Sequence, residues 1–141
     1  MTRSNPYDYV YLLKVGLDST DRRPFITQGI CHCRSCQKLS GSFFSANLIV
    51  PTASFQVYGT PKTFVRKSDS GKDDTINFWD NCGHAIFVSM ELYAGVAIVK
   101  AGTVDDGNWL KAKSRYPARE IYCKDKMEWL PQLAEAALSK S

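Results

Sequence analysis

Residues 31–36 read Cys-His-Cys-Arg-Ser-Cys, which places three thiols at the spacing Cys-x-Cys-x-x-Cys. A short loop with this spacing can turn its sulfurs inward at the distances that a tetrahedral zinc ion requires. Disulfide pairing within so short a loop would be strained, and the chain has five cysteines, an odd number that does not suit a secreted disulfide framework. The spacing therefore predicts that Cys31, Cys33 and Cys36 bind zinc.

The same loop predicts a zinc ion with one open position. A structural zinc is enclosed by four protein ligands, whereas a catalytic zinc keeps one position for water or substrate, and no cysteine or histidine directly follows this loop. Three thiolates leave the dication with a net charge of roughly −1, which suits it to exchanging a sulfur ligand better than to activating water. Arg34 and Lys38 either offset this charge or are solvated surface cations. Thiol chemistry is therefore expected, not hydrolysis.

Three further residues have two interpretations each, and a fourth has one. His32 lies between two predicted ligands and is either a catalytic proton relay or a side chain that points away from the metal. Cys82 is either a fourth zinc ligand, which would close the site, or a small buried hydrophobe. His84 is either a ligand or base, or a hydrogen-bonded surface histidine. Cys123 has no partner motif and is expected to be an inert thiol.

Length and composition bound the class of protein. A chain of 141 residues predicts one domain over 1–141, and 44% hydrophobic with 23% charged residues is typical of soluble globular proteins. The net charge of +4 is spread without a Lys/Arg run, so we expect no nucleic-acid partner. No apolar stretch is long enough to span a membrane, and Met1 to Pro6 lacks the apolar region of a signal peptide. We expect a cytoplasmic protein with a small-molecule substrate; the oligomeric state is not predicted.

The hydrophobic pattern predicts a mainly β fold. A single helical turn is expected at 37–41, stopped by Gly41, and Gln132 to Leu138 has the strong helix propensity that predicts a short C-terminal helix. The short connection at 59–61 implies antiparallel pairing, and Gly29 is expected to end a strand before the cysteine loop. Strands are predicted at 7–17, 25–28, 42–50, 55–58, 63–66, 75–79, 85–90, 94–104 and 120–122.

Several motifs in order resemble the glutathione-dependent formaldehyde-activating (GFA) family, which includes the centromere protein V group. The resemblance runs from about Gly29 to Trp129. It implies a small zinc protein of several coiled antiparallel β-sheets around the zinc-binding loop, with Cys31, Cys33 and Cys36 on a catalytic zinc. The family activity joins formaldehyde to glutathione as an S-(hydroxymethyl)glutathione synthase, a carbon-sulfur lyase, so glutathione is the implied co-substrate. The motifs are Cys-His-Cys-x-x-Cys, Ser40-Gly41-Ser42-Phe43, Phe55 with Gly59-Thr60-Pro61, Asn81-Cys82-Gly83, and Lys100-Ala101-Gly102-Thr103-Val104-Asp105-Asp106.

The chain departs from this family at a second, structural zinc site. That site is typically held by an N-terminal Cys-x-Cys pair and a later Cys-x-x-Cys-Gly, but this chain has no cysteine before Cys31 and has Trp79 where the later motif would begin. Cys82 is what remains of the four ligands. We therefore expect the structural zinc to be missing, with one zinc per chain, and aromatic packing by Trp79 to replace it.

Three functions remain in competition. The first is a zinc-dependent lyase that adds a thiol such as glutathione to formaldehyde or another small electrophile. The second is a divergent zinc enzyme that acts on a larger, aromatic metabolite by elimination, addition or decarboxylation. The third is a non-catalytic binding module whose zinc only shapes a loop, which four protein ligands would indicate. Four aromatic residues either line a pocket for the second function or belong to the core, namely Phe43, Phe44, Trp79 and Trp109.

Overall fold

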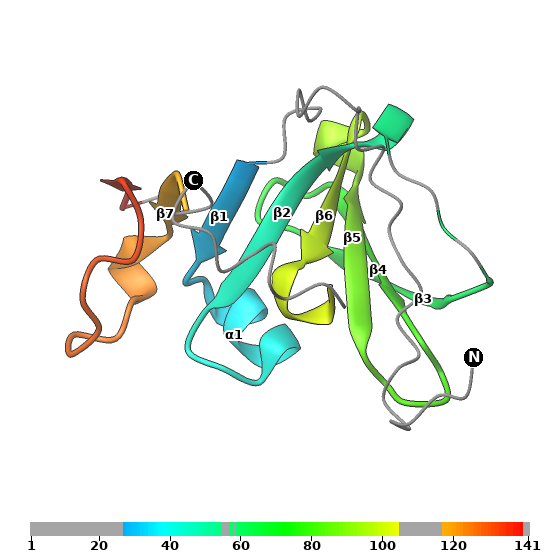
Figure 1. Cartoon of the computed structure of the whole chain (residues 1–141), viewed down its shortest axis with the longest axis horizontal. Coiled ribbons are helices and arrows are strands. Elements are labelled where there is room, and N and C mark those ends of the chain that lie inside the picture. The colour runs from blue at the N-terminus through cyan, green and yellow to red at the C-terminus, as the bar shows by residue number, and fades with distance from the viewer. Residues whose placement is uncertain (1–26, 55–56, 58, 105–116, 140–141) are drawn as a thin grey trace.

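The computed structural model describes residues 27–54, 57, 59–104 and 117–139. Its strands form one sheet of eight members in the order β3-β4-β5-β6-β2-β1-β7-β8 (Figure 1). The strands are β1 Thr27–Cys31, β2 Ser45–Pro51, β3 Lys62–Lys67, β4 Asp73–Phe78, β5 Ala85–Met90, β6 Val96–Lys100, β7 Arg119–Ile121 and β8 Ala136–Ala137. One α-helix, α1 Arg34–Ser40, and the short 3-10 turns η1 Thr52–Ser54, η2 Glu91–Tyr93, η3 Ala101–Thr103 and η5 Cys123–Asp125 complete these parts of the chain.

A mainly β fold is confirmed, but the expectation of several antiparallel sheets is wrong. The described strands belong to a single mixed sheet, in which β1 pairs with β7 in parallel and β7 pairs with β8 in parallel. Parallel neighbours require a long connection, and the chain travels from Cys31 to Arg119 before it pairs again with β1. Such a pairing between distant segments cannot be recognised from local hydrophobic alternation.

The predicted C-terminal helix is also wrong. Its residues instead contribute β8, whose backbone bonds to β7: Ala136 N donates to Ala118 O at 3.1 Å, and Leu138 N donates to Glu120 O at 2.8 Å. The neighbouring Ala134 is buried. Helix propensity is worth only tenths of a kcal/mol per residue, so pairing with an open strand edge and burial outweigh it here.

The expected strand at 7–17 and most of the expected strand at 55–58 lie outside the described residues. Within them, the strand expected at 85–90 is confirmed as β5, and those expected at 42–50, 63–66, 75–79, 94–104 and 120–122 overlap β2, β3, β4, β6 and β7. Gly29 does not end its strand. Because β1 pairs on both sides, with β2 and with β7, it continues through Cys31.

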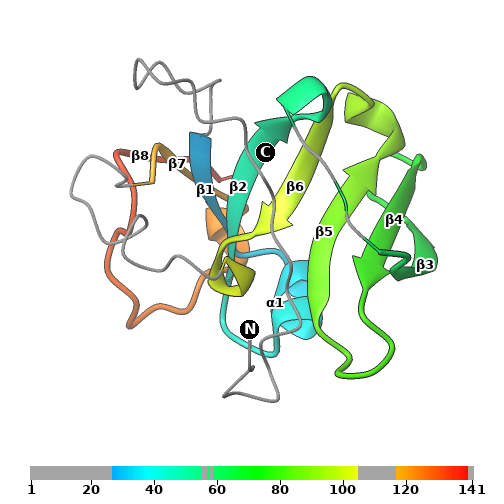
Figure 2. The same cartoon turned by 45° about the vertical axis from the view of Figure 1, so that its right-hand side comes forward.

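The two faces of the sheet differ in character. On β2 the alternation places Leu48 and Val50 on one face and Ser45 and Asn47 on the other. The first face carries the hydrophobic core, and Trp79 packs against it. Figure 2 shows how the sheet curves, with α1 at the end where β1 finishes. The buried members of the core cluster are Leu48, Val50, Ile86, Phe87, Ala97, Val99 and Ala101.

The second face carries the polar residues. The strand register pairs Cys31 with Ser45 and Asn47 with Lys100, so these four side chains share one face at the same end of the sheet. That end is also where β1 finishes and α1 begins. Apolar packing behind the sheet therefore supports a polar surface in front of it.

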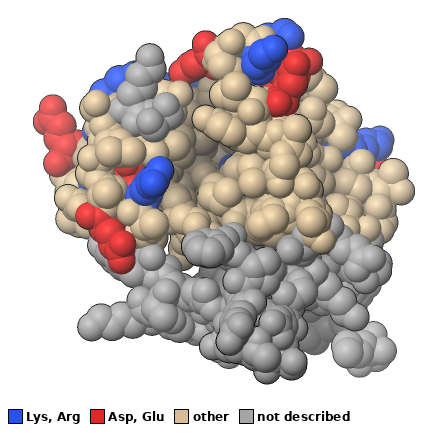
Figure 3. Space-filling model, turned by 90° about the horizontal axis from the view of Figure 1, so that it is seen from above, with Lys and Arg blue, Asp and Glu red and all other residues tan. Residues whose placement is uncertain are grey.

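No helix in the described ranges is long and apolar enough to cross a membrane. On the face seen in Figure 3, Lys and Arg side chains lie beside Asp and Glu side chains instead of gathering in a patch of one sign.

Candidate metal centre

The three cysteines of the loop meet at the junction between a strand and a helix. Cys31 is the last residue of β1, Cys33 is the N-cap of α1, and Cys36 lies in the first turn of that helix. Their sulfurs all lie within 4.8 Å of one another, and none of the three forms a disulfide. The helix starts at Arg34, earlier than the turn predicted at 37–41, and ends as expected at Gly41, which has a φ of 65°. A zinc ion fits this donor set because three convergent thiols are its preferred ligands.

Hydrogen bonds among the thiols divide the negative charge unequally. Bonding with Cys31 and with Cys36 lowers the pKa of Cys33. Bonding with Cys33 and Cys36, together with burial, raises the pKa of Cys31. For Cys36 the bond with Cys31 lowers the pKa, but the bond with Cys33, burial and the charge of Cys33 outweigh it and raise the pKa. Cys33 thus holds the negative charge while the other two share their protons with it, and a divalent cation would displace those protons.

The N-cap position contributes to this division of charge. The Cys33 sulfur accepts a hydrogen bond from the backbone N–H of Cys36 at 3.3 Å. An N-cap side chain normally satisfies one of the free N–H groups at the start of a helix, and here a thiolate does so. The sequence spacing therefore produces both the cluster and the helix start that stabilises it.

Lys100 faces this cluster, although the sequence indicated no role for it beyond its place as the first residue of a family motif. Its Nζ donates to Ser45 Oγ and to Asn47 Oδ1, each at 3.0 Å, and Ser45 Oγ donates to Asn47 Oδ1 at 2.8 Å. Burial lowers the pKa of Lys100, while the charges of Cys36 and then of the other two thiols raise it. The alternation of β6 could have drawn attention to Lys100. Because Val99 belongs to the core, its neighbour Lys100 at the end of the strand must lie on the opposite, polar face.

A second cation, Arg66 of β3, lies on the same side of the sheet. Hydrogen bonds with Cys31 and Cys36 are the main causes that lower the pKa of Cys33, and the positive charge of Arg66 lowers it further. Arg66 Nε lies 3.8 Å from Asp74 Oδ2 on β4. Burial raises the pKa of Asp74 even though Arg66 lowers it. Arg66 therefore has a carboxylate partner of its own.

The two cations that flank the loop in sequence are placed differently. Arg34 and Lys38 are both exposed on α1, and Arg34 Nη1 donates to Gln37 Oε1. The cations that act most strongly on the thiols are Lys100 and Arg66. Nearness in sequence was therefore a poor guide to the charges around the cluster.

His32 points into a second buried network. It is fully buried, and its Nε2 lies 2.8 Å from Glu120 Oε1 on β7. Glu120, also fully buried, accepts from Lys126 Nζ at 2.8 Å and from the backbone N–H of Leu133 at 2.7 Å. His32, Glu120 and Cys123 offer ligand atoms within 4.8 Å of one another, which makes them a second group that could hold a metal. The catalytic role of His32 stays a prediction.

The C-terminal segment also fastens the cysteine loop through backbone contacts. His32 N donates to Ile121 O at 3.1 Å, and Gln37 Nε2 donates to His32 O at 2.8 Å and to Asp125 O at 3.2 Å. β7 and η5 therefore hold the loop from the side opposite β2. Sequence reasoning missed this because the contacts join segments 88 residues apart.

The other predicted residues are not gathered at the thiols. Cys82 is half-buried and His84 exposed, in the turn between β4 and β5, and neither joins the two metal-type groups found among the described residues. The expected loss of a second zinc site is not confirmed, because the structure has the Cys31/Cys33/Cys36 cluster and a second candidate group beside it. Trp79 packs against the core and close to Gly59, where a Cβ would lie 3.0 Å from its ring.

The aromatic residues divide between surface and interior. Phe43 is 50% exposed and Trp129 65% exposed, and their rings meet edge to face with centroids 5.2 Å apart. Phe44 is half-buried and lies edge-on to His32, with centroids 5.9 Å apart. Trp109 and the aspartates of the Asp105-Asp106 turn lie outside the described residues.

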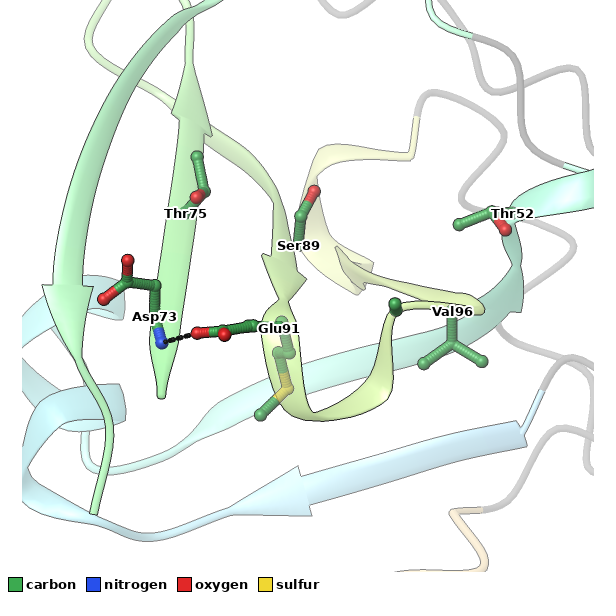
Figure 4. A pocket seen from close by; sticks show the side chains of 8 residues that line it. Thr52, Asp73, Thr75, Ser89, Glu91 and Val96 are labelled. Carbon is green, nitrogen blue, oxygen red and sulfur yellow. Dashed lines mark hydrogen bonds between the residues drawn. The ribbon is translucent and has the colours of Figure 1, made fainter. Parts of the chain in front are cut away.

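A hollow elsewhere on the sheet, with a volume of about 390 Å³, contains no cysteine (Figure 4). Its two carboxylates are already engaged: Glu91 Oε2 accepts from Asp73 N at 2.8 Å, and Asp73 Oδ1 pairs with Lys67 Nζ at 2.5 Å. It therefore offers no free charged group for a ligand. Its lining residues are Thr52, Asp73, Thr75, Ser89, Met90, Glu91, Ala94 and Val96.

Comparison with known proteins assigns the chain to a family. No curated protein matches this sequence. The family model described as glutathione-dependent formaldehyde-activating enzyme matches residues 13–125, most of the chain and all three thiols. The chain therefore belongs to the GFA family, whose members are carbon-sulfur lyases.

Proposed function

We propose that this chain is a zinc-dependent enzyme of the carbon-sulfur lyase type that adds a thiol, by default glutathione, to formaldehyde or another small electrophile. The observation that carries the proposal is the group of three sulfurs within 4.8 Å, which no fourth Cys, His or carboxylate ligand joins among the described residues. A closed structural site would need that fourth protein ligand. An open position suits a substrate thiol.

Cys31, Cys33 and Cys36 would hold the metal. Bound zinc supplies a positive charge that stabilises a thiolate or polarises a carbonyl oxygen. In the reaction the thiol sulfur bonds to the carbonyl carbon, the C=O electron pair moves to oxygen, and the thiol proton ends on that oxygen. No oxidant or reductant is consumed.

The chain's own residues contribute position and charge. The pairing of β1 with β2 and β7 holds the buried Cys31, and α1 holds Cys36 with its sulfur within 4.8 Å of that of Cys31. Lys100 and Arg66 place positive charge beside the thiols. A rigid donor set next to fixed charges orients the reacting sulfur without further rearrangement.

A second candidate function rests on the Phe43 and Trp129 pair. Two large aromatic rings that are at least half exposed and in mutual contact could bind an apolar or aromatic substrate. The candidate is a zinc enzyme that acts on a larger aromatic metabolite by elimination, addition or decarboxylation. Activity lost in Trp129→Ala on such a compound, but not on formaldehyde, would favour it.

We further propose a small-molecule substrate, no nucleic-acid or membrane partner, and a reducing cytoplasmic setting. The support for the reducing setting is that all five cysteines are free thiols, which a reducing compartment preserves.

The test joins metal analysis to turnover. We expect about one zinc per chain, and an X-ray absorption spectrum with three sulfurs and one lighter ligand. Glutathione with ¹³C-formaldehyde should then form the hydroxymethyl adduct faster in the presence of the protein, as followed by NMR. A shell of four protein sulfurs, or no acceleration by the fully loaded protein, would overturn the assignment in favour of a non-catalytic binding module.

A further inference from the structure

Lys100 differs from the two other half-buried cations of the described residues, Arg66 and Lys126, in having no carboxylate partner. None of the ion pairs found in the described parts of the chain includes it, whereas Lys126 pairs with Glu120 and Arg66 with Asp74. Its two hydrogen-bond acceptors, Ser45 and Asn47, are neutral. A half-buried ammonium without a counter-charge is unfavourable, so negative charge nearby would stabilise its charged form.

The thiol cluster is the negative charge that Lys100 faces. Ser45 pairs with Cys31 across the β1–β2 ladder, and Lys100 bonds to Ser45, so the ammonium lies one side chain away from the cluster. The two neutral acceptors use two of the three N–H groups of Lys100 and hold it in place. This fixed position makes Lys100 part of the site and not a mobile surface cation.

Charge balance then indicates what the cluster would accept. Three thiolates and a zinc dication sum to −1, and Lys100 brings that sum to zero. Arg66 and its partner Asp74 together add no net charge. An anionic fourth ligand would meet a neutral site with Lys100 present, but a site of net charge −1 without it. The affinity for a neutral fourth ligand would be almost the same with and without Lys100.

We propose that Lys100 is a specificity-determining residue that selects an anionic sulfur ligand, a thiolate, for the fourth position at the cluster. This inference rests on the proposed metal site but not on lyase activity. Ser45 and Asn47 are the positioning residues that hold the ammonium.

The test uses the full chain loaded with Co²⁺, because cobalt in a thiolate site reports its ligands by visible absorption. Wild-type protein and Lys100→Met are titrated with 2-mercaptoethanol, which binds as a thiolate, and with imidazole, a neutral ligand. We expect Lys100→Met to bind 2-mercaptoethanol about tenfold or more weakly, and imidazole within about twofold of wild type.

Two further variants separate charge from structure. Lys38→Met removes an exposed cation of α1 and should leave both affinities unchanged. Lys100→Arg keeps the charge and should recover most of the affinity for 2-mercaptoethanol. Equal weakening for both ligands in Lys100→Met, an effect of Lys38→Met as large as that of Lys100→Met, or loss of cobalt from Lys100→Met would overturn the inference.

Turnover with glutathione and formaldehyde is measured separately on the zinc-loaded wild type. Selective loss of thiolate binding in Lys100→Met upholds the inference even where that turnover is absent, so a failure of the proposed function is distinguished from a failure of the role of Lys100.

Discussion

Two groups of side chains that could hold a metal ion are neighbours, since His32 of the second group stands between Cys31 and Cys33 of the first in the sequence. They differ in what already occupies their ligand atoms. In the Cys31/Cys33/Cys36 cluster the sulfurs bond mainly to one another. In the His32/Glu120/Cys123 group both oxygens of Glu120 accept hydrogen bonds, from Lys126, His32 and the backbone of Leu133. Ligand atoms that lie within the same distance limit are therefore not equally available to a metal ion.

The difference shows that distance alone does not make a metal site. A metal at the thiols would displace protons that the sulfurs share, whereas a metal at Glu120 would have to displace an ammonium bound at 2.8 Å. Separating a buried carboxylate from its partner is unfavourable, because it leaves an uncompensated buried charge. The first group is thus suited to binding, and the second to fastening the C-terminal segment to the cysteine loop.

The largest expected effect comes from breaking the thiol cluster. Cys36→Ser leaves Cys31 and Cys33, two ligands that cannot hold zinc against a chelator, so zinc affinity should fall more than about 100-fold. Competition with a chromogenic chelator measures it. Cys123→Ser is the matched control, because it removes a thiol from the other group, and it should retain the zinc. Equal loss in both variants would mean that the two groups bind metal alike.

Next comes the removal of charge from the second group. Glu120→Gln leaves Lys126, which is 14% exposed, without its counter-charge, and should lower the free energy of unfolding by about 3 kcal/mol. Urea unfolding at pH 7 measures this. Glu91→Gln is the control, since Glu91 is 53% exposed and should cost less than about 1 kcal/mol.

The contribution of Glu120 to stability should also depend on pH. Burial by itself raises the pKa of Glu120, but hydrogen bonds from Lys126, His32 and Leu133 outweigh it and lower the pKa below its ordinary 4.5. A carboxyl with a lowered folded pKa stabilises the protein above pH 4.5, and the contribution disappears as pH falls through the lowered value. The stability gap between wild type and Glu120→Gln should therefore narrow below that pH. A gap that stays constant down to pH 3 would contradict a charged Glu120.

The smallest expected effect is that of Cys82→Ser. Cys82 is half-buried and belongs to neither group among the residues that the structure describes, so the change should cost about 1 kcal/mol of stability and leave the zinc in place. Thermal unfolding and metal analysis of the same sample measure both. Zinc released as readily as from Cys36→Ser would make Cys82 a fourth ligand and would end the enzyme assignment.

Local features of the chain were predictable because their causes are local. Cys31, Cys33 and Cys36 lie within six residues of sequence, so spacing alone could indicate their cluster. The end of α1 at Gly41 follows from the freedom of glycine to adopt a positive φ. The strand β5 follows from a run of apolar and β-branched residues.

Features that join distant segments depended on the tertiary structure. Residues 136–137 form a strand despite their helix propensity, because β7 offers them backbone partners that no local pattern reveals. Lys100 and Glu120 read as ordinary charged residues in the sequence, and only the strand register brings the first to Ser45 and the second to His32. Ligand spacing is set by short-range geometry, whereas the charges that surround a ligand are set by which strands become neighbours, and that is a property of the whole sheet.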